Sequence, residues 1–182
     1  MANAESKGAR IEQLLAAEDW SRARRAIRAR LKSSPDDHWL LSRLALTHYE
    51  QRQYTKALEL DRRAVRRAPG CPLALWGLAG TYQMLGRHSE AVSIYEHLIR
   101  KGAPALSKGP CGEGIRWARA LVADCWFRLG QTRKAQDDIG RARAAYKKYL
   151  ALRPTGSIYS AAEAKKALRD LRAARGGKQP GA

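Results

Sequence analysis

The chain repeats a small set of residues at intervals of 34 positions. Ala23, Ala57 and Ala91 follow one another at this interval, and Pro35 and Pro69 do the same. A fixed period of this length indicates an array in which each copy is one supersecondary unit. Because such a unit cannot bury its apolar face alone, we expect neighbouring units to stack and share a continuous core.

The most complete copy, residues 73–101, reads as two amphipathic helices joined by a turn at Gly86-Arg87. Apolar and small residues recur every three or four positions on one face of each helix: Leu75, Leu78, Ala79 and Tyr82 on the first, and Ala91 and Tyr95 on the second. The spacing L-x2-L-A-x2-Y, then A-x3-Y, resembles the tetratricopeptide repeat pattern W-x2-L-G-x2-Y…A-x3-F…P.

This resemblance implies an all-α fold, a right-handed α-solenoid of about four helix-turn-helix units with a C-terminal capping helix. The expected repeat domain covers residues 4–154. Within this domain we expect repeat units near 4–37, 38–71, 72–101 and 116–154, with an inserted loop at 102–114. A capping helix at 155–175 and a disordered tail at 176–182 are expected to follow it.

The last unit follows a segment rich in Gly and Pro, residues 102–114, which cannot continue a helix. Beyond it, the pattern resumes 44 residues after its previous copy. Leu78-Ala79 corresponds to Val122-Ala123, Tyr82 to Trp126, Gly86 to Gly130 and Ala91 to Ala135. This alignment predicts a turn at Gly130 and a long second helix over residues 132–152, with a kink at Gly140.

The capping helix has its own start signal. Ser160-x-x-Glu163 has the spacing of a capping box. Ile158, Leu168 and Leu171 are expected to face inward, so that the helix covers the edge of the last unit.

In the family that the pattern resembles, the first helix of each unit lines a concave surface. Once the packing positions are set aside, the expected groove residues are Trp39, Arg43, Leu46, Tyr49, Leu73, Trp76, Gly80, Gln83, Trp117, Leu121, Asp124 and Arg128. Gly77 and Gly80 are expected to open space beside Trp76. The three tryptophans are expected to anchor a partner. For Trp39 and Trp117 the sequence leaves open the alternative that they pack between repeats or under the loop.

The second helices carry much of the net charge of +18, which gives a pI of about 10.5. The expected basic surface consists of Arg24, Arg25, Arg28, Arg62, Arg63, Arg66 and Arg67. Such a convex surface either binds nucleic acid phosphates or acidic proteins, or is simply a solvated face.

No constellation of residues indicates an enzyme, a cofactor or a metal site. The segment GPCGEG lacks the Lys and Ser/Thr of a phosphate-binding loop, and the four histidines are scattered with no H-E-x-x-H spacing. Three cysteines without a C-x-x-C pair favour a reducing compartment. With no apolar signal segment or membrane span, a cytoplasmic location is expected.

The sequence therefore predicts a non-catalytic adaptor or scaffold that binds a peptide or helix of another protein in its concave groove. The alternative is an RNA-, DNA- or ribosome-associated protein that binds through the basic convex surface. The Lys and Asn residues with which some relatives grip chaperone tails have no counterpart on the expected inner helices. Neither the partner's identity nor the oligomeric state follows from the sequence.

Overall fold

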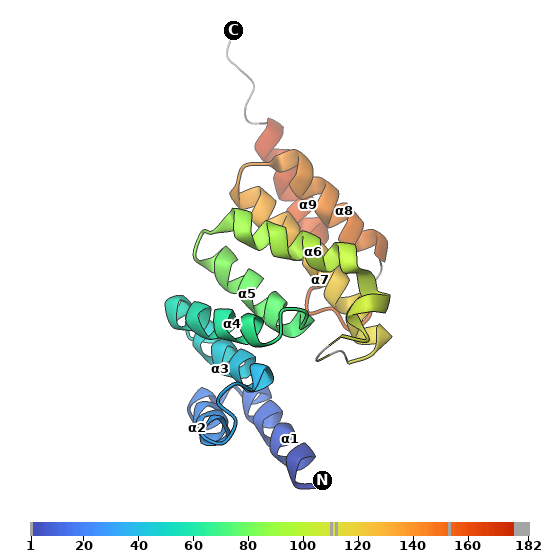
Figure 1. The fold of residues 1–182 in the computed structure, drawn as a ribbon. Coiled ribbons are helices and arrows are strands. Elements are labelled where there is room, and N and C mark those ends of the chain that lie inside the picture. Colours follow the sequence, from blue (N-terminus) through green and yellow to red (C-terminus); the bar gives the residue numbers. More distant parts are fainter. Residues whose placement is uncertain (1, 110, 112, 153, 177–182) are drawn as a thin grey trace. The chain divides into compact units, whose positions relative to one another are not determined.

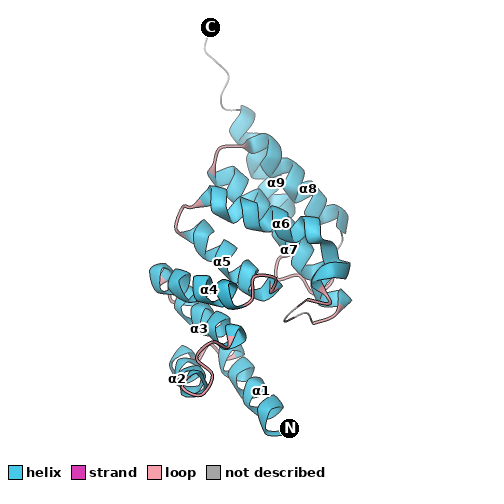
Figure 2. Ribbon diagram, in the orientation of Figure 1, coloured by secondary structure: helices cyan, strands magenta, loops and turns pink. Residues whose placement is uncertain are grey.

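The computed structural model describes residues 2–109, 111, 113–152 and 154–176, and this part of the chain is helical without any strand (Figures 1 and 2). The helices are α1 (Ala2–Ala16), α2 (Trp20–Leu31), α3 (His38–Glu50), α4 (Tyr54–Arg67), α5 (Pro72–Met84), α6 (His88–Leu106), α7 (Ile115–Ala135), α8 (Ile139–Leu152) and α9 (Ala161–Gly176). They form two compact units, Met1–Leu85 and Gly86–Ala182. The border falls inside the third expected repeat.

The first unit is built from helical hairpins whose apolar faces meet. Helix α1 packs against α2, α2 against α3, and α5 against both α3 and α4. One core cluster of this unit combines Ile11 and Leu15 of α1, Ala23 and Ile27 of α2, and Leu40 and Leu44 of α3. The shared cluster shows that neighbouring repeats complete each other's core, as repeat stacking requires.

The second unit continues the hairpin pattern and ends with α9. Helix α6 packs against α7, α7 against α8, and α8 against α9. Phe127 of α7 contacts Tyr146 and Tyr149 of α8 edge to face, with ring centroids 5.3 Å apart in both pairs. Ala164 and Leu171 of α9 join this cluster, so α9 buries apolar surface of the preceding hairpin.

The turns inside the repeats share one backbone conformation. Glu18, Arg52 and Gly86 have φ angles of 55°, 57° and 73°, and these positions are 34 residues apart. Asp137 has the same conformation in the turn between α7 and α8, with φ 57°. The left-handed conformation reverses the chain between the helices of each pair, and the predicted turn at Gly86 is confirmed.

The predicted register of the last repeat is wrong. Gly130 lies inside α7, which continues to Ala135, and the turn comes seven residues later at Asp137. Ala142 and Tyr146, with 0% and 2% of their surface exposed, stand 51 residues after the equally buried Ala91 and Tyr95. The repeat pattern W-x2-L-G is therefore met by Trp126-x2-Leu129-Gly130, where the glycine is a packing position.

The sequence placed seven additional residues of the last repeat in its second helix, whereas the structure has them in its first helix, α7. They lengthen α7, so α8 begins at Ile139 rather than near residue 132. Ala135, expected in the core, is exposed. Gly140 lies in the first turn of α8 and is no kink in a long helix.

The segment expected to be an inserted loop is partly helical. Gly102 breaks α6 with φ 72° and ψ 161°, and residues 103–106 then form one further helical turn. Pro110 and Gly112 lie outside the described residues. None of the helices in the described part of the chain combines the length and apolar character that a membrane span requires.

The capping box that opens α9 is confirmed. The amide of Ser160 donates to Glu163 Oε2 over 2.7 Å, and the amide of Glu163 donates to Ser160 Oγ over 3.2 Å. The amide and the hydroxyl of Ser160 both donate to the Glu163 carboxylate, and these two hydrogen bonds hold the pKa of Glu163 below its usual value. Ile158 was expected to face inward, but 66% of its surface is exposed, and Tyr159 stacks on Phe127 instead, with ring centroids 4.0 Å apart. Residues 177–182 of the expected tail lie outside the described part.

Candidate functional site

Two arginines lie over the ring of Trp39, the first expected groove residue of α3. The guanidinium carbons of Arg30 and Arg43 lie 5.9 and 5.4 Å from the centroid of the partly buried Trp39 ring. Arg43 Nε also donates to Glu12 Oε1 over 2.6 Å, and only 14% of the Arg43 side chain is exposed. Arg43 therefore joins α3 to α1, and Trp39 packs against the core cluster of the first unit.

The two glycines of α5 bring this helix close to its neighbours. A Cβ atom on the buried Gly80 would lie 3.7 Å from Cε2 of Tyr49, and one on Gly77 would lie 2.9 Å from Oδ1 of Asp61. The expectation that Gly77 and Gly80 open space for a ligand is wrong, because the side chains of α3 and α4 occupy that space.

The remaining groove residues of the first unit are partly exposed. They are Leu46 and Tyr49 of α3, and Leu73, Trp76 and Gln83 of α5. Tyr49 contacts Tyr54 edge to face, with ring centroids 5.5 Å apart. This unit therefore keeps aromatic and aliphatic side chains within reach of solvent on its first helices.

The expected groove residues of α7 belong to the second unit, and two of them are buried. Leu121 and Asp124 expose 7% and 5% of their surface, whereas Trp117 and Arg128 are partly exposed. Asp124 accepts hydrogen bonds from Ser157 Oγ and, over 3.3 Å, from the amide of Ile158. The segment before α9 thus covers this part of α7, and the expectation that Leu121 and Asp124 face a ligand is wrong. Burial raises the pKa of Asp124.

A second buried carboxyl lies at a core position of the repeat. Asp61 stands 34 residues after Ile27 and 34 before Tyr95, and all three are buried. Thr81 Oγ1 donates to Asp61 Oδ2 over 2.6 Å, and burial raises the pKa of Asp61 to about 7. Asp61 was not among the residues expected to matter, although the period itself places it among core side chains.

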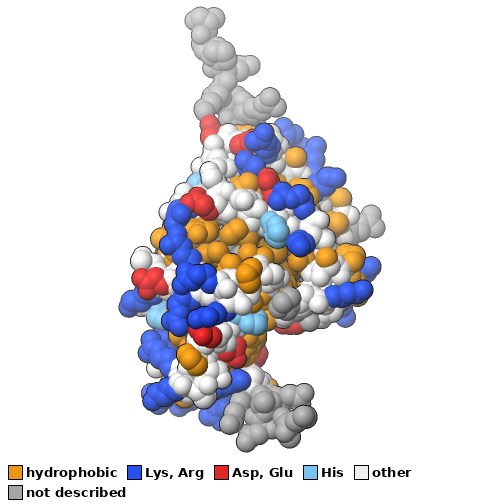
Figure 3. Space-filling model, viewed as in Figure 1, with side chains coloured by type: hydrophobic (Ala, Val, Ile, Leu, Met, Phe, Trp, Pro, Cys, Tyr) orange, Lys and Arg blue, Asp and Glu red, His pale blue; other side chains and the backbone are white. Residues whose placement is uncertain are grey.

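The expected basic surface lies on α2 and α4, and Lys and Arg side chains are abundant on the face in Figure 3. Several of its arginines contact the protein itself. Arg67 forms an ion pair of 2.7 Å with Asp36, Arg24 donates to Gln51, and Arg62 lies 5.8 Å from the ring centroid of Tyr82. Arg63 donates to the carbonyl of Pro35 over 3.5 Å. Six arginines of this surface are exposed: Arg25, Arg28, Arg62, Arg63, Arg66 and Arg67.

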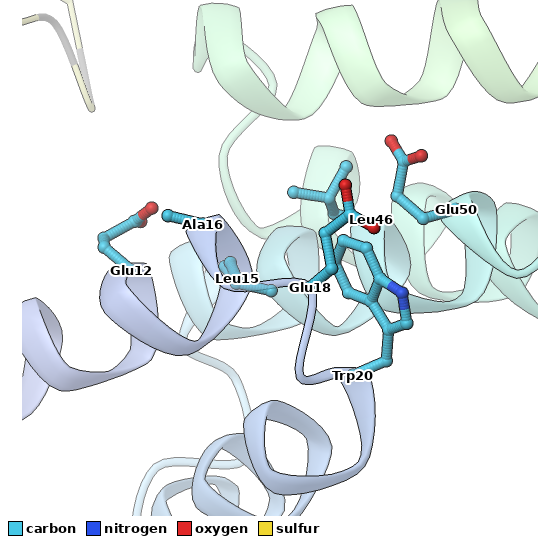
Figure 4. Close-up of a pocket in the computed structure, with 7 residues that line it drawn as sticks. All are labelled: Glu12, Leu15, Ala16, Glu18, Trp20, Leu46 and Glu50. Atoms are coloured by element: carbon cyan, nitrogen blue, oxygen red, sulfur yellow. The ribbon is translucent and has the colours of Figure 1, made fainter.

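A pocket of about 490 Å³ lies in the first unit between α1, the α1–α2 turn and α3 (Figure 4). We call it the N-terminal pocket, and its main lining residues are Glu12, Leu15, Glu18, Trp20, Leu46 and Glu50. Only Leu46 was expected from the sequence. The spacing of Glu12 and Leu15 on α1, and of Leu46 and Glu50 on α3, could have indicated it, because residues three or four apart share a helix face.

Comparison with protein families gives two matches. Models described as tetratricopeptide repeat match residues 36–100 and residues 123–155. The second match begins at Ala123 and agrees with the register that the structure shows for the last repeat. No curated protein sequence matches this chain significantly.

Solved structures share the fold at low sequence identity. A crystal structure of MamA is 17% identical with a TM-score of 0.66, covering 91% of this chain and 84% of that one. TTC0263, a tetratricopeptide repeat protein of Thermus thermophilus, is 21% identical with a TM-score of 0.61, covering 94% and 82%. The Sgt2 repeat domain of Aspergillus fumigatus is 23% identical with a TM-score of 0.56, covering 80% and 86%. These similarities show an all-α solenoid fold of stacked helical hairpins.

Proposed function

Because the chain belongs to the tetratricopeptide repeat family, we propose that it is a non-catalytic adaptor that binds a peptide or helix of another protein. The binding face would be the inner face of α3 and α5, which both belong to the first unit. A solenoid of helical hairpins offers an extended surface for such a segment. A cytoplasmic location is part of the same proposal, and cell fractionation tests it.

One observation carries the proposal beyond the family. Leu73 and Trp76 stand one turn apart on α5 and are both partly exposed, although most of the apolar residues around them are buried. Large aromatic side chains within reach of solvent are common binding anchors. We therefore assign Leu73 and Trp76 as the main contacts, with Leu46, Tyr49 and Gln83 beside them.

Affinity capture from a lysate of the source organism tests this function. The tagged protein is used at low and at high salt, with and without nuclease. We expect a protein partner that persists in all four conditions, because an apolar contact responds little to salt. Capture that disappears with nuclease would contradict the proposal and point to phosphate contacts.

A pair of matched variants assigns the contact to the first helices. Leu73→Ala and Trp76→Ala should each reduce capture at least fivefold, whereas Leu58→Ala should not. Leu58 is a partly exposed leucine on the second helix α4 and serves as the control. Thermal melts followed by circular dichroism show whether each variant is folded. Equal capture by all three folded variants would refute the assignment.

A further inference from the structure

We propose that the N-terminal pocket binds a lysine or arginine side chain of the partner segment. This inference rests on the proposed adaptor function and gives its partner a chemical character: a basic segment with apolar neighbours. Four features of the pocket support this: its charge, its apolar floor, its size and its position.

The charge of the pocket is opposite to that of the chain. Three carboxylates line it, from Glu12, Glu18 and Glu50, and no Lys or Arg side chain does so. The whole protein has a net charge of +18. A local acidic concavity in such a chain favours a cationic group there and disfavours an acidic one.

Two of the three carboxylates are not neutralised by the protein. Glu12 pairs with Arg43 over 2.6 Å. Neither Glu18 nor Glu50 has an ion-pair partner within the part of the chain that the structure describes. An incoming ammonium or guanidinium group would therefore meet two carboxylates that are not engaged in an ion pair with the described residues.

The floor of the pocket suits the carbon chain of such a residue. Trp20 and Leu46 are partly buried, Leu15 is buried, and all three pack in the core cluster of the first unit. Figure 4 shows the Glu18 carboxylate beside the Trp20 indole and Leu46, with Glu50 one turn further along α3. Lysine and arginine bury their methylene groups on apolar surface while the charged end stays near water, and an indole face attracts a cation.

The size and position of the pocket fit a protein segment. Its volume of about 490 Å³ falls within the range of roughly 300–1,000 Å³ that ligand pockets span. It is formed by α1 and α3, the first helices of two successive repeats, and Leu46 belongs both to it and to the proposed binding face. A segment lying along that face would reach the pocket with one side chain.

Labelled peptides test the proposal by fluorescence anisotropy. Four nine-residue peptides alternate Leu with Lys, Arg, Gln or Glu and are titrated with the full chain. We expect the Lys and Arg peptides to bind at least tenfold more tightly than the Gln peptide, and the Glu peptide to bind most weakly. Equal binding of the Lys and Gln peptides would overturn the proposal.

Matched double variants locate the effect. Glu18→Gln with Glu50→Gln should weaken binding of the Lys peptide about tenfold, whereas Glu59→Gln with Glu113→Gln should leave it unchanged. The control pair makes the same change in net charge at two exposed positions outside the pocket. An equal loss in both pairs would mean unspecific attraction and would overturn the pocket. Full displacement of the Lys peptide by spermine at equal concentration would also overturn it in favour of a small-cation site.

The same variants separate this inference from the adaptor function. If Glu18→Gln with Glu50→Gln leaves peptide binding intact while Trp76→Ala reduces partner capture at least fivefold, the pocket inference fails and the adaptor function stands. If the peptide results hold but partner capture depends on nucleic acid, the adaptor function fails.

Discussion

The ring of Tyr146 lies directly against Gly130, so that a Cβ atom at residue 130 would come within 2.9 Å of Cζ and 3.0 Å of Cε1 and Cε2. Tyr146 is buried between α7 and α8 and contacts Phe127 edge to face. An aromatic ring held in this way cannot move aside cheaply. The close approach of the two helices in the last repeat therefore depends on a residue without a side chain.

Gly130→Ala should destabilise the protein, although alanine favours helix by about 1 kcal/mol over glycine. We expect a net loss of about 1–3 kcal/mol in the free energy of unfolding, because overpacking a closed core has that cost. Urea denaturation measures it. Gly140→Ala is the control: the nearest side-chain atom to its added Cβ is 4.0 Å away, so this variant should be unchanged or slightly more stable. Equal stability of both variants would contradict the packing described here.

In the turns inside the repeats, replacing a side chain with glycine should stabilise the protein. Arg52→Gly and Asp137→Gly should each stabilise the protein by up to about 1 kcal/mol, because both residues adopt a left-handed conformation that strains a side chain. Gly86→Ala should destabilise it by about 1 kcal/mol for the same reason. Thermal melts that show no rise for either glycine variant would argue against strained turns at these positions.

Because the pKa of Asp61 is raised, we expect the free energy of unfolding to fall as pH rises. Its pKa is about 7 in the folded protein and 3.8 in an unfolded reference, so the folded state holds its proton more tightly. The stabilisation is complete below about pH 4 and is lost as pH rises through 7, with a total on the order of 4 kcal/mol. Denaturation between pH 4 and 8 measures this slope.

Asp61→Asn should remove the larger part of that slope, because the amide keeps an acceptor for Thr81 and does not ionise. Asp124, whose pKa burial also raises, contributes a residual slope in the same direction. Asp170→Asn, a change at an exposed position of α9, should leave the wild-type profile intact. An unchanged slope in Asp61→Asn would show that this carboxyl does not control the pH response.

Much of the fold follows from the period. The turn at Gly86 and the burial of Ala79 and Ala123 agree with the repeat pattern, and the capping box of α9 agrees with the Ser160-x-x-Glu163 spacing. The last repeat does not, because Gly130 suits both the turn position and the small-residue packing position of the pattern. The packing of Tyr146 against Gly130 and the turn at Asp137 decide for the packing position.

The candidate site was less predictable, because exposure depends on contacts far along the chain. Leu121 and Asp124 were expected on the inner face of a first helix, yet both are buried, and Asp124 is bonded to Ser157 and Ile158, more than 30 residues away in the sequence. The N-terminal pocket was not predicted either, because two of its lining residues lie outside regular helix positions. Glu18 and Trp20 lie in a turn and at a helix start, where helix periodicity says nothing about which side chains meet.

The most direct test of the adaptor function is photo-crosslinking from defined positions. A benzophenone side chain is placed at Leu73 on α5 and, in a separate variant, at Arg66 on α4, and both proteins are irradiated in a lysate of the source organism. The account predicts that position 73 crosslinks one protein, the one recovered by affinity capture, and that position 66 does not. Crosslinks to that protein only from position 66, or to nucleic acid from position 66, would contradict it.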